Sequence, residues 1–127
     1  MKNDPVSKRI PNSISYSSWA DAFRGGVLVD VSELARRMGY DVPVAVTRRV
    51  WEEWIQPSES TEEGAAHRMR RILSVLWGKT RGTSTQYNLQ VFLPVGGDRI
   101  VLADLAAFLE PVDTSDTVVT IMRLDEV

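Results

Sequence analysis

The chain contains no cysteine and only one histidine, His67. Without thiols it can form no disulfide framework, zinc knuckle or iron–sulfur cluster, and it has no thiol nucleophile. A single imidazole also excludes every site that needs two. We therefore expect no metal site and no cofactor.

Long hydrophobic runs and a charge excess are also missing. No stretch approaches the roughly 20 apolar residues that span a bilayer, and residues 1–10 lack the apolar core of a secretory signal. Fifteen Lys and Arg against 17 Asp and Glu give a net charge of −2. Such a balance draws the chain to neither nucleic acid nor anionic lipid. We expect a cytoplasmic protein that contacts no membrane and does not have nucleic acid as its partner.

The 127 residues are 43% hydrophobic and 25% charged, which is typical of one soluble domain. Residues 1–13 carry Pro5 and Pro11 among polar side chains and cannot bury an apolar face. We predict a flexible arm over 1–13 and a single domain over 14–127.

Helix signals follow a short apolar run at 27–29, which predicts a brief strand. Ser32 and Thr47 are placed to cap two short helices. Ser60 and Glu63 have the spacing of a capping box and open the longest helix, which we expect to end near residue 78 or 79. Its apolar stripe repeats with helical spacing at Ala65, Met69, Ile72, Leu73 and Leu76.

The remainder of the chain changes to strand periodicity. Apolar residues alternate over 87–93, and two further apolar segments lie at 100–109 and 118–122. The pattern predicts an α+β fold: a three-stranded antiparallel meander packed on one long helix, with short N-terminal helices and a short extra strand. Whether the strand at 27–29 joins the main sheet stays open.

No catalytic motif is present, and we expect no catalytic residue. The sequence has no G-x-S-x-G elbow, phosphate-binding glycine loop or H-E-x-x-H pair. His67 lies opposite the apolar stripe beside Arg71, which favours an exposed side chain over a general base. Asp30 and Glu33 lie between a strand and a helix. Together with His67 they define the alternative of an acidic cleft, in a small enzyme or ligand-binding protein.

Basic residues of the long helix form the main candidate binding surface. His67, Arg68 and Arg71 are close together, and Trp77 lies at the edge of the apolar stripe. Such a strip can meet phosphates or an acidic protein surface, although a solvated helix face has the same pattern. No aromatic platform for bases accompanies it, which disfavours the alternative of a nucleic-acid accessory protein.

The segment 25–35, GGVLVDVSELA, followed by PVAVT at 43–47 and Val50–Trp51, resembles an uncharacterised family. The family is a domain of unknown function in short proteins of phages, plasmids and mobile elements. The resemblance implies no catalytic residue. It implies a non-enzymatic protein that binds a host or phage protein, with inhibition of a host defence system as its specific form. The partner and the oligomeric state stay open.

Overall fold

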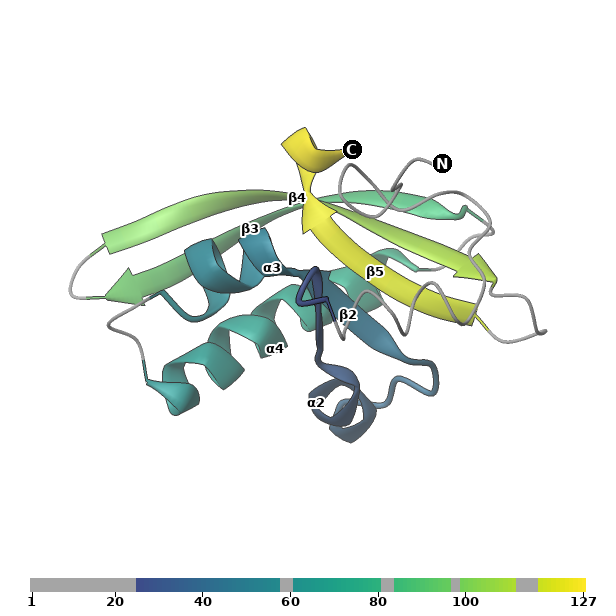
Figure 1. Cartoon of the computed structure of the whole chain (residues 1–127), viewed down its shortest axis with the longest axis horizontal. Coiled ribbons are helices and arrows are strands. Elements are labelled where there is room, and N and C mark those ends of the chain that lie inside the picture. Colours follow the sequence, from purple (N-terminus) through teal and green to yellow (C-terminus); the bar gives the residue numbers. More distant parts are fainter. Residues whose placement is uncertain (1–24, 58–60, 81–83, 97–98, 112–116) are drawn as a thin grey trace.

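A computed structural model describes residues 25–57, 61–80, 84–96, 99–111 and 117–127. It shows a sheet with helices packed against one of its faces (Figure 1). The elements are, in chain order, β1 (Leu28–Asp30), α2 (Ser32–Arg37), β2 (Val44–Thr47), α3 (Arg48–Val50), η2 (Trp51–Ile55), α4 (Glu62–Lys79), β3 (Gln86–Gly96), β4 (Arg99–Pro111), β5 (Thr117–Arg123) and η3 (Leu124–Glu126). The predicted arm over 1–13 lies outside the described residues.

The sheet has five strands in the order β1-β2-β5-β4-β3. Neighbouring strands are antiparallel except β2 and β5, which pair in parallel with Ala45 opposite Thr120. The α+β class is confirmed, and the three predicted C-terminal strands pair antiparallel as β3, β4 and β5. The expectation that they form a three-stranded sheet was wrong, because they belong to a five-stranded mixed sheet. It missed β2, whose partner lies more than 70 residues further along the chain. The strand predicted at 27–29 joins the sheet through β2.

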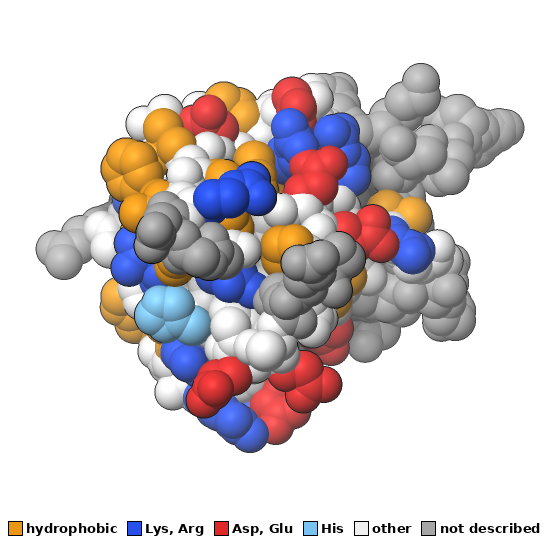
Figure 2. Space-filling view, turned by 90° about the vertical axis from the view of Figure 1, so that its left-hand side faces the viewer, with side chains coloured by type: hydrophobic (Ala, Val, Ile, Leu, Met, Phe, Trp, Pro, Cys, Tyr) orange, Lys and Arg blue, Asp and Glu red, His pale blue; other side chains and the backbone are white. Residues whose placement is uncertain are grey.

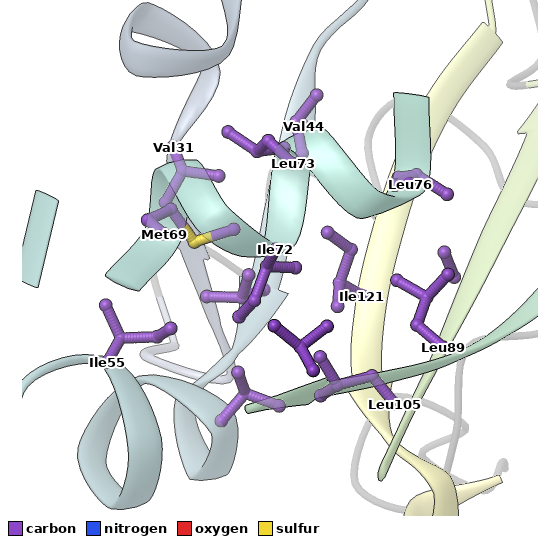
Figure 3. Close-up of a cluster of buried hydrophobic side chains, with 14 of the residues drawn as sticks. Val31, Val44, Ile55, Met69, Ile72, Leu73, Leu76, Leu89, Leu105 and Ile121 are labelled. Carbon is purple, nitrogen blue, oxygen red and sulfur yellow. The ribbon is translucent and has the colours of Figure 1, made fainter. Parts of the chain in front are cut away.

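The apolar stripe of α4 packs against the sheet and contributes Ala65, Met69, Ile72, Leu73 and Leu76 to the main core (Figure 3). Leu73 and Leu76 are fully buried, as is Ile121 of β5. The helix begins one residue later than the proposed capping box requires, because the Thr61 hydroxyl accepts from the Gly64 amide at 3.0 Å. Thr61 rather than Ser60 is therefore the N-cap, and Ser60 of the predicted capping box lies outside the described residues.

The two short helices differ in their caps. Thr47 caps its helix as predicted, because its hydroxyl accepts from the Val50 amide. Ser32 does not cap α2: its hydroxyl accepts from the Val44 amide at 2.9 Å and so ties α2 to β2. The Asp30 carboxylate accepts from the Ser32 amide instead, at 2.9 Å.

Truncating the centre of the α4 stripe is expected to destabilise the fold strongly. Leu73 is fully buried, so Leu73→Ala removes apolar contacts and leaves a cavity, at a cost of about 2–5 kcal/mol. Ser74→Ala, on the exposed side of the same helix, is the matched control. Urea unfolding midpoints check the difference, and equal midpoints would contradict the helical phase.

Candidate functional site

Arg68 is a structural residue rather than part of an exposed basic strip. Only 6% of it is exposed, and burial lowers the pKa of its guanidinium. Its Nε donates to the Ile55 carbonyl at 2.8 Å and its Nη1 to the Pro94 carbonyl at 3.0 Å. The prediction that Arg68 is an exposed binding residue was wrong. The aliphatic part of the Arg68 side chain is buried, while its guanidinium reaches the backbone oxygens of Ile55 and Pro94.

Arg71 is exposed and contacts the free edge of the sheet. Its Nε donates to the Phe92 carbonyl at 3.0 Å. β3 is an edge strand, and Pro94 lies opposite Ile100 without an amide hydrogen to give to β4. The backbone groups of Phe92 and Pro94 therefore point away from β4. Arg71 and Arg68 cover both of these carbonyls, which protects this half of the edge from pairing with another strand.

Trp77 is 53% exposed, in line with the sequence, but it packs on the end of α2. Its ring meets Tyr40 edge-on, with centroids 5.0 Å apart, and lies over Gly39. The Tyr40 hydroxyl donates to the Leu73 carbonyl at 2.6 Å, and burial raises the pKa of Tyr40 to about 12. Trp77 therefore helps to attach α2 to α4, about 15 Å along the helix from His67.

The structure does not bring His67 together with Asp30 and Glu33. His67 and Arg71 border a hollow of about 380 Å³ on the solvent side of α4. Figure 2 shows the single histidine, in pale blue, beside basic side chains. Asp30 and Glu33 border another pocket, of about 410 Å³, between α2 and α4. The imidazole and the two carboxylates therefore form no common cleft.

An exposed apolar patch on the β3–β4 hairpin is the feature that the sequence reasoning missed. Phe92, Ile100 and Leu102 are 60%, 66% and 43% exposed. Phe92 lies directly opposite Leu102 in the register, and Ile100 lies opposite Pro94. The sequence contains a signal for this patch, because Phe92 occupies an outward-facing position of the alternating pattern, in phase with Gln90 and Pro94.

The same face of the sheet is buried further along the strands. Leu28, Ala45, Ala106, Val118 and Met122 form a second apolar cluster there. Glu110 is 5% exposed beside it, and Oε1 of this carboxyl has no hydrogen-bond partner in the part of the chain that the structure describes. Burial raises the pKa of Glu110 to about 7.

The part of the chain that the structure describes contains neither a candidate metal centre nor a candidate membrane-spanning helix. Among the described residues, no three His, Asp or Glu side chains gather in a way that could hold a metal ion. None of the described helices combines the length and apolar character needed to cross a bilayer. Comparison with protein-family models, curated proteins and solved structures finds no match. The family resemblance of segment 25–35 therefore stays a prediction.

Arg68→Lys is expected to destabilise the protein even though it preserves the charge. The planar guanidinium of Arg68 donates to two separate carbonyls, on Ile55 and Pro94, whereas lysine offers a single ammonium group. Leaving one carbonyl unpaired costs roughly 1–3 kcal/mol. Arg70→Lys, at an exposed position of the same helix, controls for the change of residue type. Urea midpoints measure both variants, and an unchanged Arg68→Lys midpoint would refute the structural role.

Glu110→Gln is expected to stabilise the protein only at neutral and alkaline pH. The native pKa of about 7 exceeds the ordinary value of 4.5, so the native state holds this proton more tightly than the unfolded chain. The wild-type contribution is complete below pH 4.5 and is lost as the pH rises to 7. Glutamine avoids this loss, on the order of 1–3 kcal/mol. Unfolding curves at pH 4 and pH 8 test it, and an equal effect at both values would exclude a raised pKa.

Proposed function

We propose that the chain is a non-enzymatic protein-binding domain. Its contact surface is the hairpin surface, which consists of Phe92, Ile100 and Leu102 together with Arg71 and Arg99. The observation that carries the proposal is the exposure of three large apolar side chains on neighbouring strands. Contiguous exposed apolar side chains are costly in water and mark interaction sites in soluble proteins.

Two arginines lie at the margin of the hairpin surface rather than among its apolar side chains. Arg71 reaches the β3 edge from α4, where its Nε donates to the Phe92 carbonyl, and Arg99 is exposed at the start of β4. Figure 2 shows basic and hydrophobic side chains sharing this end of the molecule. An apolar centre with a charged rim is the usual composition of a protein interface. The partner is expected to present an apolar patch flanked by carboxylates, which arginine pairs with well.

The resemblance to mobile-element proteins supports a specific form of this function. A domain that needs only surface contact can block a host enzyme by covering it. In this proposal the partner is a host protein of a defence system and the effect is inhibition. The proposed contact surface is thus the hairpin surface, which includes Arg71. It replaces the basic strip with Arg68 and Trp77 that was expected from the sequence.

Site-specific photocrosslinking in the native cell tests the proposal. The photoreactive residue p-benzoylphenylalanine replaces Ile100 in one variant, and Trp77 or Asn88 in two controls that are also exposed to solvent. We expect one protein adduct from position 100 that is absent at 77 and 88. The paired change Arg71→Glu and Arg99→Glu should reduce this adduct about tenfold, because each arginine then repels carboxylates of the partner.

Purified components give the quantitative test. Phe92→Ser should weaken binding of the crosslinked protein by about tenfold or more, as for an interface hot spot. Asn88→Ser, on the same face of β3, should leave the affinity unchanged. Equal crosslinking at all three positions, or adducts made only of this chain, would refute the proposal. Micromolar binding to random duplex DNA that weakens steeply with salt would replace it with a nucleic-acid role.

A further inference from the structure

The α2–α4 pocket is the strongest feature that the proposed function does not use. Its volume is about 410 Å³, and its walls come from α2, η2 and α4. The floor is apolar, with Val31 and Met69 almost completely buried beneath it. Figure 3 shows these two side chains next to each other at the edge of the core. Trp51 forms part of the wall and is half-buried.

Negative charge dominates the rim of the pocket. Asp30, Glu33 and Glu62 line it, whereas Arg37 is its single cation among the described residues. Arg37 is already paired with Glu33 at 3.0 Å. Asp30 accepts the Ser32 amide, and within the described chain neither Asp30 nor Glu62 forms a salt bridge. Two carboxylates therefore remain available to an incoming cation.

A π-helical turn builds the wall around Trp51. The Gln56 amide donates to the Trp51 carbonyl at 2.7 Å, a spacing of five residues instead of the usual four. Both residues at the ends of this hydrogen bond line the pocket. Single π turns are rare and occur frequently at functional sites. The irregular turn is thus an observation independent of the charges on the rim.

We infer that the α2–α4 pocket binds an arginine side chain of a partner protein. The apolar stem of arginine would lie on the floor near Met69, and its guanidinium would face Asp30 and Glu62. The planar group pairs with carboxylates through two parallel hydrogen bonds and also stacks on an indole ring such as that of Trp51. Lysine lacks this planar geometry.

The pocket lies on a different side of α4 from the hairpin surface. Glu62, Ala65, Ala66 and Met69 face the pocket, whereas Arg71 reaches the β3 edge. The inference does not rest on the proposed function, and either one can fail without the other.

NMR titration of the full chain with Nα-acetyl-arginine methylamide tests the inference. This probe carries the side chain as a peptide presents it, and Nα-acetyl-citrulline methylamide is its uncharged isostere. We expect the indole Nε1–H signal of Trp51, assigned with a Trp51→Phe variant, to shift when the arginine probe is added. The citrulline probe should bind about tenfold more weakly, as expected for the loss of a charge-assisted hydrogen bond.

Paired variants of α4 distinguish the pocket from the general field of the helix. Glu62→Gln should weaken binding of the arginine probe several-fold, because its carboxylate lines the pocket. Glu63→Gln removes the same charge from the next residue, which does not line the pocket, and should have no effect. Asp30→Asn keeps an oxygen that can accept the Ser32 amide and should also weaken binding.

Three results would overturn the inference. Equal binding of arginine and citrulline would remove the role of the carboxylates. Equal losses in Glu62→Gln and Glu63→Gln would assign the effect to the field of the whole helix end. Tighter binding of free arginine than of its blocked derivative would assign the pocket to a small metabolite instead of a partner's side chain.

Discussion

Two hydrogen bonds from the Arg68 guanidinium hold the positions of the surfaces on either side of α4. One reaches the Ile55 carbonyl at the end of η2, and the other reaches the Pro94 carbonyl near the tip of the β3–β4 hairpin. Without them, two carbonyls would be left unpaired beside the buried face of α4, which is energetically costly. The same cation therefore positions the hairpin surface and the π turn that forms a wall of the α2–α4 pocket.

The sequence predicted elements better than it predicted their arrangement. The period of Ala65, Met69, Ile72 and Leu76 was enough to place the longest helix, because helical spacing is a local property. The parallel pairing of β2 with β5 was not accessible, since nothing near Ala45 indicates that Thr120 lies beside it. The sheet was therefore predicted with too few strands.

Site residues were harder to predict because chemical type and helical phase gave opposite answers. Arg68 lies three residues after Ala65 and four before Ile72, which places it in the buried phase, but its charge suggested exposure. The phase decided the outcome, because backbone oxygens were available to pair the guanidinium. In the hairpin the conflict was reversed: Phe92 is apolar but occupies the outward phase, and it is exposed. Periodicity was the better guide in both cases.

The small net charge conceals a separation of charge across α4. Arg71 and Arg99 lie at the sheet edge and strand start near the exposed apolar patch, whereas Asp30 and Glu62 line a pocket on another side of α4. Charges so placed cancel in the total of −2 but create local fields of opposite sign. Specific contact with proteins depends on such local fields rather than on the total charge. Near-neutrality of this chain is therefore compatible with two selective surfaces, each suited to partner groups of different charge.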